Sequence, residues 1–258
     1  MINPHPASLT LSTPLHFMER GIKGVRWICL VISLSFVIWI LSFAACEAKS
    51  VWNGNKSRNV VAITFDDGPK PEYCQPILDI LDKYGAKATF FVVGKEAEDN
   101  PDLIMRMYDS GHEIGNHTYS HVSVKDISKG EALGEIQRCS QVIYDITGEQ
   151  PKYFRPPGGS TNSAIANGLK KMGLRTVYWS LNAADYIEMT PGYEVPEDYK
   201  AMAKELSKRV VDKVSPGTII LLHNGSEQTV IALPFILSEL KTRGYGFVTL
   251  SNMTEEKI

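Results

Sequence analysis

The sequence predicts an α/β fold, a distorted (β/α)7-type barrel with a parallel sheet, preceded by a single N-terminal transmembrane helix. Two observations predict the barrel. Short apolar, β-branched runs alternate with segments whose apolar residues recur at helical spacing, and glycines close many of the turns between them. A long uncharged run near the N-terminus predicts the transmembrane helix. The chain has 258 residues, 43% of them hydrophobic and 22% charged, which suits one large domain with an additional segment.

Residues 27–46 form the uncharged run, and a helix needs about 20 apolar residues to cross a bilayer. Three basic residues closely precede it: Arg20, Lys23 and Arg26. The positive-inside rule therefore places the first residues in the cytoplasm and the rest of the chain outside. A cleaved signal peptide and a lipoprotein signal ending at Cys46 are the alternatives, and both would also export the domain. The expected division of the chain is a cytoplasmic segment 1–26, an anchor or signal segment 27–46, a linker 47–57 and a folded domain 58–258.

Strands and helices are expected to alternate along the folded domain. The expected strands are Val60–Phe65, Ala88–Val93, Glu113–Asn116, Tyr153–Arg155, Thr176–Leu181, Thr218–His223 and Phe247–Leu250. The expected helices are Pro76–Tyr84, Pro101–Tyr108, Lys129–Thr147, Ser163–Met172, Glu197–Lys213 and Gln228–Arg243. Such an alternation predicts parallel strands covered by helices on both sides, and seven units predict an incomplete or distorted barrel.

Residues suited to chemistry follow the ends of these strands: Asp66, Asp67, His117, Arg155, Asp185 and His223. In parallel α/β folds the loops at the carboxyl ends of the strands converge on one opening. We therefore expect these side chains to form a single site.

The pair Asp66-Asp67 and the pair His117 and His121 indicate a mononuclear metal site. Successive side chains on a strand point in opposite directions, so both carboxylates can face one cavity only where the backbone turns, which we expect at Gly68-Pro69. One carboxylate would bind the metal with the histidines. The other would be left to move protons.

Several other classes of function are disfavoured. The residues between His117 and His121 contain no Glu, unlike the zinc-protease motif, so a base must come from elsewhere and Asp66 is the candidate. No Gly-x-Ser-x-Gly motif, phosphate-binding loop or dinucleotide fingerprint is present. A net charge of −2 without a basic stripe gives no indication of nucleic-acid binding. Arg155 is either a surface residue of a loop or a partner that keeps a carboxylate ionised, and His223 is either structural or functional.

Five motifs in order make residues 58–252 resemble the polysaccharide deacetylase (NodB-homology) family, carbohydrate esterase family four. They begin at Thr64, His117, Phe154, Asn182 and Leu221. The resemblance implies a distorted barrel and a divalent metal, zinc first, with cobalt, manganese or nickel as alternatives. It also implies removal of N-acetyl groups from amino sugars in polymers.

Carried over by position, the resemblance gives each residue a role. Asp66 matches the general base, and Asp67, His117 and His121 match the metal ligands. His223 matches the general acid. Asp185 matches the residue that tunes this acid, Arg155 the residue that braces the base, and Leu221 the apolar wall for the acetyl methyl group.

Two departures from the family pattern concern the substrate groove. Gly158 stands where an aromatic residue is usual, although its backbone amide could still contact the substrate. Asn182 and Tyr186 replace an Asp and a Trp of the fourth motif. These changes leave the groove wall and the substrate preference open.

The expected function is N-deacetylation of a cell-wall glycan, with peptidoglycan N-acetylglucosamine (GlcNAc) or N-acetylmuramic acid (MurNAc) as the target. The expected partners are this polysaccharide and, through the N-terminal helix, the membrane; nucleic acid is not expected. The alternatives are a chitin-oligomer deacetylase, an O-acetyl esterase with the same scaffold, and a catalytically silent, membrane-tethered glycan-binding protein.

Overall fold

The structure is a computed structural model that describes residues 50–161, 163–185 and 199–254. The predicted transmembrane segment 27–46 and the predicted groove residue Tyr186 lie outside the described residues. Among the helices of the described ranges, none combines the length and apolar character needed to cross a bilayer.

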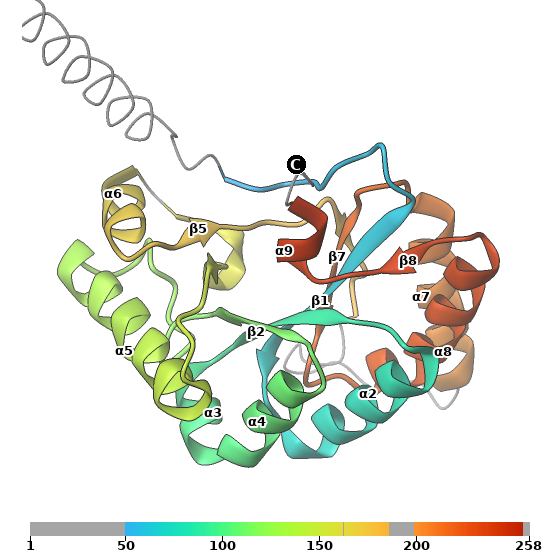
Figure 1. The fold of residues 1–258 in the computed structure, drawn as a ribbon, viewed down its shortest axis with the longest axis horizontal. Coiled ribbons are helices and arrows are strands. Elements are labelled where there is room, and N and C mark those ends of the chain that lie inside the picture. The colour runs from blue at the N-terminus through green and yellow to red at the C-terminus, as the bar shows by residue number, and fades with distance from the viewer. Residues whose placement is uncertain (1–49, 162, 186–198, 255–258) are drawn as a thin grey trace, which may run out of the picture. The chain divides into compact units, whose positions relative to one another are not determined.

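The described residues form an α/β fold around one parallel sheet (Figure 1). The strands are β1 (Val60–Gly68), β2 (Ala88–Val92), β3 (Glu113–Asn116), β4 (Tyr153–Phe154), β5 (Arg175–Thr176), β6 (Leu181–Asn182), β7 (Ile219–His223) and β8 (Gly246–Phe247). Their order is β5-β4-β3-β2-β1-β7-β6, and β8 pairs with the first two residues of β1. The parallel sheet is confirmed, although it has eight strands within the described residues rather than about seven.

The helices are α2 (Pro71–Tyr84), α3 (Gly94–Asp99), α4 (Pro101–Asp109), α5 (Lys129–Thr147), α6 (Ser163–Lys171), α7 (Tyr199–Lys213), α8 (Glu227–Thr242) and α9 (Leu250–Thr254), with a short 3₁₀ turn η1 at Pro157–Gly159. The long helix α5 matches its predicted bounds because a Ser128–Glu131 capping box begins it and Gly148, with φ of 76°, ends it. Helix α2 begins at Pro71 rather than at Pro76, because Pro71 fits the first helical turn and the later proline is accommodated inside the helix.

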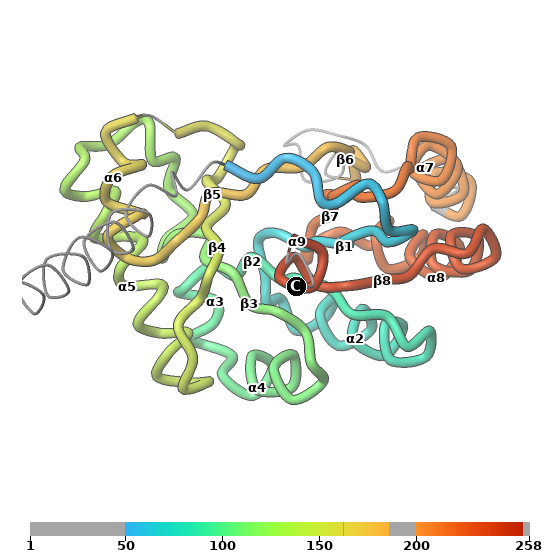
Figure 2. The backbone as a smooth tube through the Cα atoms, turned by 45° about the horizontal axis from the view of Figure 1, so that its top comes forward, coloured from blue at the N-terminus to red at the C-terminus, as the bar shows by residue number. Residues whose placement is uncertain are grey.

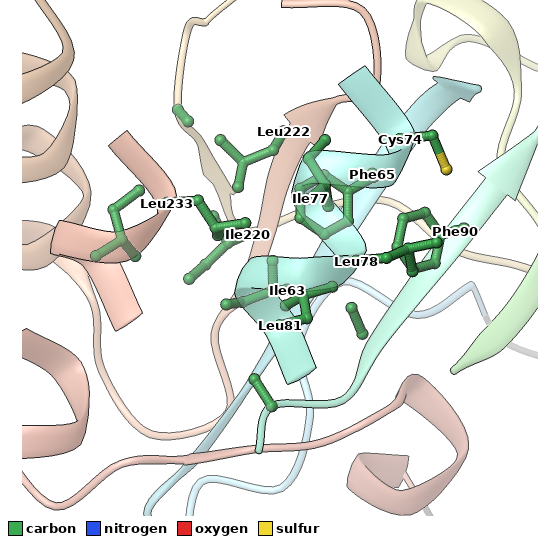
Figure 3. Packing of buried hydrophobic residues seen from close by; sticks show 14 of the residues in the cluster. Ile63, Phe65, Cys74, Ile77, Leu78, Leu81, Phe90, Ile220, Leu222 and Leu233 are labelled. Atoms are coloured by element: carbon green, nitrogen blue, oxygen red, sulfur yellow. The ribbon is translucent and has the colours of Figure 1, made fainter. Parts of the chain in front are cut away.

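The two faces of β1 have different environments. Ile63 and Phe65 belong to the main apolar cluster, together with Ile77 and Leu78 of α2 (Figure 3). Phe65 also stacks on Phe90 of β2, with ring centroids 5.0 Å apart. Because side chains alternate along a strand, the even-numbered residues of β1 up to Asp66 lie on the opposite, inner face of the sheet. The outer face therefore supplies the core and leaves the inner face available for polar residues.

The inner face carries the polar residues of β1 and β7 in register. Thr64 pairs with Leu221, and Asp66 pairs with His223 across the β1–β7 ladder. Adjacent strands lie about 4.8 Å apart, so this register brings the last two side chains together. The main core thus positions the inner-face residues.

The predicted strand Thr176–Leu181 is wrong as a single strand. It consists of two short strands, β5 and β6, that pair with β4 and β7 at opposite edges of the sheet. Residues 177–180 cross between these edges, held by hydrogen bonds from the Val177 amide to the Phe154 carbonyl and from the Ser180 amide to the Ile219 carbonyl. Apolar composition cannot distinguish this crossing from a continuous strand.

Two other local predictions need correction. The predicted strand Phe247–Leu250 is a strand only at Gly246–Phe247, because Leu250 already begins α9, where the Met253 amide bonds to the Thr249 carbonyl. Residues 50–57, expected to lie in a linker, are attached to the domain at two points: Val51 pairs with Val177 and is 6% exposed, and the Gly54 amide donates to the Gly217 carbonyl. Figure 2 shows this first described segment passing from β5 toward the start of β7.

Candidate metal centre and active site

A bulge in β1 allows two successive carboxylates to face one cavity. The pairing of β1 with β2 shifts register between Phe65 and Gly68, and Asp67 has a left-handed backbone with φ of 72°. An extra residue in a strand re-aims the side chain that follows it. Asp tolerates the left-handed region better than most residues. The change of direction therefore lies at Asp67 itself, inside β1, and not at Gly68-Pro69 as predicted.

Asp67, His117 and His121 form a cluster with metal-ligand geometry. The Nε2 atoms of His117 and His121 lie 3.3 Å and 3.0 Å from Asp67 Oδ1. One ligand atom from each residue lies within 4.8 Å of the others. Two imidazoles and one carboxylate form a donor set typical of open catalytic zinc sites. The predicted triad is thus brought together, and its residues fit a divalent cation.

Electrostatics at this cluster favour a bound positive charge. Burial alone would raise the pKa of Asp67, but hydrogen bonds from His117 and His121 outweigh it and hold that pKa well below its usual range. The hydrogen bond to Asp67 in turn raises the pKa of His121, against the effect of burial. An ionised carboxylate between two imidazoles attracts a proton or a metal cation, and metal binding would displace the proton.

The loop that carries the two histidines is held from outside the cluster. His117 Nδ1 lies 2.7 Å from the carbonyl oxygen of Arg155, which directs Nε2 toward Asp67. The amide of Ser120 donates to Glu135 Oε2 at 2.7 Å. This support stabilises the left-handed backbone of His121, whose φ is 59°. Glu135 was not among the predicted site residues, because no local pattern indicates that this half-buried residue of α5 reaches the loop.

Asp66 is separated from the triad by its bond to Arg155. Arg155 Nη1 donates to Asp66 Oδ1 at 2.7 Å, and both side chains are almost fully buried. Asp66 Oδ2 lies 3.9 Å from His117 Nε2, so this second oxygen faces the metal cluster. The two oxygens of one carboxylate therefore have different surroundings, one bonded to a guanidinium and one directed at the site.

Arg155 is buried, but its guanidinium has several hydrogen-bond acceptors. It also donates to Thr64 Oγ1 at 2.8 Å and to the Tyr178 carbonyl at 3.1 Å, and its guanidinium lies 4.1 Å from the centroid of the Phe91 ring. Of the two interpretations of Arg155, the surface one is wrong, because its exposed fraction is 0%. The crossing segment after β5 supplies the Tyr178 carbonyl, so the unexpected break in that predicted strand is part of the site.

His223 and Asp185 form the second acid–base pair. His223 Nδ1 lies 2.7 Å from Asp185 Oδ1, and the His223 amide donates to Asp185 Oδ2 at 2.7 Å. Thr229, which sequence reasoning did not single out, donates a further hydrogen bond to Asp185. Burial alone would lower the pKa of His223, but Asp185 outweighs it and the pKa rises to about 9. Asp185 therefore favours the cationic form of His223.

The predicted groove residues have different outcomes. Leu221 is 3% exposed and lies between Thr64 and Asn182 in the ladder, next to His223. Gly158 lies in η1, is exposed, and has a left-handed backbone with φ of 67°. A Cβ at Gly158 would meet nothing within 4 Å, so neighbouring atoms leave space where the family usually has an aromatic side chain.

Comparison with known proteins identifies the family. A sequence profile described as polysaccharide deacetylase matches residues 53–177. A peptidoglycan-N-acetylglucosamine deacetylase from Bacillus cereus is 38% identical over 209 residues, which cover 80% of this chain and 93% of the relative. The chain belongs to the polysaccharide deacetylase family.

Solved structures of this family include both active and inactive members. A crystal structure of a peptidoglycan N-acetylglucosamine deacetylase has a TM-score of 0.73 and 32% identity, covering 83% of this chain and 95% of that chain. A pseudoenzyme of family CE4 from Bacillus anthracis has a TM-score of 0.72 and 27% identity, covering 81% and 70%. The fold therefore does not decide activity, which depends on the residues of the site.

The first prediction concerns the buried ion pair. Arg155→Met should lower the free energy of unfolding by about 3–5 kcal/mol, because it leaves the Asp66 carboxylate buried without its partner. Urea unfolding measures this change. Arg175→Met, at an exposed strand position, is the matched control and should change stability by no more than about 0.5 kcal/mol.

A double variant separates the ion pair from packing. Adding Asp66→Asn to Arg155→Met should recover part of the lost stability, because the uncompensated charge is removed. If the two substitutions have additive effects on the free energy of unfolding, or if Arg155→Met is as mild as the control, the structure does not depend on this ion pair as proposed.

Proposed function

We propose that this member of the polysaccharide deacetylase family is a divalent-metal-dependent hydrolase that removes N-acetyl groups from the amino sugars of a cell-wall glycan, with peptidoglycan GlcNAc as the first substrate. One observation carries the proposal: adjacent carboxylates have separate surroundings, Asp67 between two imidazoles and Asp66 on a guanidinium. MurNAc and chitin oligomers are alternative sugars, and an O-acetyl ester is an alternative bond.

Asp67, His117 and His121 would hold the metal. Their nitrogen and carboxylate donors suit zinc, with cobalt, manganese or nickel as alternatives, better than magnesium or calcium, which prefer oxygen ligands alone. A divalent cation at this position supplies Lewis acidity that polarises a carbonyl group and makes water a stronger nucleophile.

Asp66 Oδ2 is the proposed proton acceptor. Oδ1 is occupied by Arg155, so Oδ2 is the oxygen that faces the cluster and can take the proton of the attacking water. The fixed guanidinium also prevents the carboxylate from rotating away. This arrangement provides a base beside the metal ligands without using it as a ligand.

His223 is the proposed proton donor. Its Nδ1 is bonded to Asp185, so the proton that reaches the leaving nitrogen comes from Nε2. Amines are poor leaving groups unless protonated, so an amide requires this acid more than an ester does. Leu221 would contact the acetyl methyl group, and the amide of Gly158 would donate to the developing oxyanion.

The second prediction separates chemistry from metal binding. Asp66→Asn and His223→Ala should each reduce acetate release from GlcNAc oligomers and peptidoglycan about 10²–10⁴-fold, the usual contribution of an acid or base, while zinc binding persists. Asp67→Ala should weaken zinc binding by more than the roughly 10–100-fold that is lost when a hydrogen-bond partner of a metal ligand is removed. Acetate assays and zinc titration measure the two effects.

The outcomes distinguish the alternatives. A wild-type protein that binds glycan but releases no acetate would be a silent binding protein; family CE4 is known to include a pseudoenzyme. Release from O-acetylated but not N-acetylated polymer would indicate an esterase. Wild-type turnover in both Asp66→Asn and His223→Ala would contradict the proposed roles.

The third prediction is a pH dependence. The pKa of His223 is raised to about 9, so its acid form is present below that pH and is lost above it. The rate should therefore fall on the alkaline side. Asp185→Asn removes the partner that raises this pKa, and the alkaline limb of kcat should move down toward the ordinary value of about 6.5. An unchanged limb in this variant would show that another group controls it.

The fourth prediction concerns localisation. We propose that residues 27–46 cross the membrane and place the domain outside, with signal cleavage as the alternative. In bacterial cells producing the full chain, protease added to intact protoplasts should degrade the domain, which should otherwise fractionate with membranes. Recovery of a protected protein in the cytosolic fraction would contradict both forms of export.

A further inference from the structure

A cleft beside the metal cluster contains two lysines that the proposed chemistry does not use. The cleft has a volume of about 350 Å³ and is lined by the predicted ligands Asp67 and His121. Lys70, Lys95 and Glu96 also line it. A substrate bound at the metal would therefore have its neighbouring groups next to these charges.

Both lysines are anchored to the segments that carry the metal ligands. The Lys70 amide donates to Asn224 Oδ1 at 3.2 Å, and Lys70 follows Asp67 by three residues. The Lys95 amide donates to the Tyr119 carbonyl at 2.9 Å, between the two histidines of the cluster. Because their backbones are fixed to the ligand loops, the two side chains start from defined positions at the rim.

Neither ammonium group has an acidic partner among the described residues. The salt bridges in residues 50–161, 163–185 and 199–254 involve neither Lys70 nor Lys95. Glu96 is the one carboxylate lining the cleft that is not a predicted metal ligand. With Asp67 assigned to the metal, the cleft has an excess of positive charge.

We propose that Lys70 and Lys95 form a subsite for a carboxylate carried by the glycan near the sugar that loses its acetyl group. This inference rests on the proposed function and specifies its substrate class. Peptidoglycan carries carboxylates on its peptide stems, or on lactyl groups that bear no peptide, whereas chitin is neutral. The subsite thus favours an acidic, peptide-bearing glycan over a neutral oligomer.

The fifth prediction compares two substrates in the zinc-loaded protein: a peptide-bearing peptidoglycan fragment and a neutral chitin oligomer with the same number of sugars. Lys70→Gln and Lys95→Gln should each raise the KM for the acidic fragment about fivefold relative to that for the neutral oligomer, the size of an exposed ion pair. Glu96→Gln should change this ratio in the opposite direction. Added salt should weaken the preference of the wild type.

Lys83→Gln is the matched control, because Lys83 is an exposed lysine in the last turn of α2 and does not line the cleft. Equal changes of KM for both substrates, or no change for the acidic one, would overturn the inference. The dissociation constants of the two substrates for the zinc-loaded protein, measured by calorimetry, should change in the same ratio as their KM values. If the wild type releases no acetate from either substrate, the proposed function fails, and calorimetry alone then decides whether the lysines bind the carboxylate.

Discussion

The buried ion pair between Asp66 and Arg155 is the interaction on which the rest of the site depends. The Arg155 guanidinium fixes one oxygen of Asp66. The backbone carbonyl of Arg155 lies 2.7 Å from His117 Nδ1 and orients that imidazole. One residue thus positions both the candidate base and a candidate metal ligand. The Tyr178 carbonyl accepts from Arg155, so the segment that crosses between the sheet edges is tied to the same group. A buried charge pair of this kind is valuable for specifying geometry more than for adding stability.

The sheet supplies the second constraint. Helices pack on one face of β1, so the other face can carry polar side chains toward a common interior. The register of β1 and β7 brings Asp66, the candidate base, beside His223, the candidate acid. The bulge at Asp67 then adds the metal ligand without displacing the base. The candidate acid, the candidate base and one candidate metal ligand therefore lie on two neighbouring strands.

The sequence predicted the parts of the structure that depend on local signals. Helix α5 has a capping box and a terminal glycine, and its bounds are as predicted. The triad was found because Asp and His side chains at strand ends are chemically distinctive. The crossing after β5 was missed because apolar residues suit a strand and a buried crossing equally. The support from Glu135 was missed because it is a long-range contact, with no local pattern. The position of the bulge also depends on pairing between strands, which one strand's sequence does not reveal.

The most direct test of the account is a crystal structure of the zinc-soaked protein with anomalous diffraction measured at the zinc absorption edge. We expect one peak bounded by the side chains of Asp67, His117 and His121, with Asp66 outside the coordination shell and still bonded to Arg155. A peak that includes Asp66 as a ligand, or no peak at this cluster, would contradict the division between ligand and base.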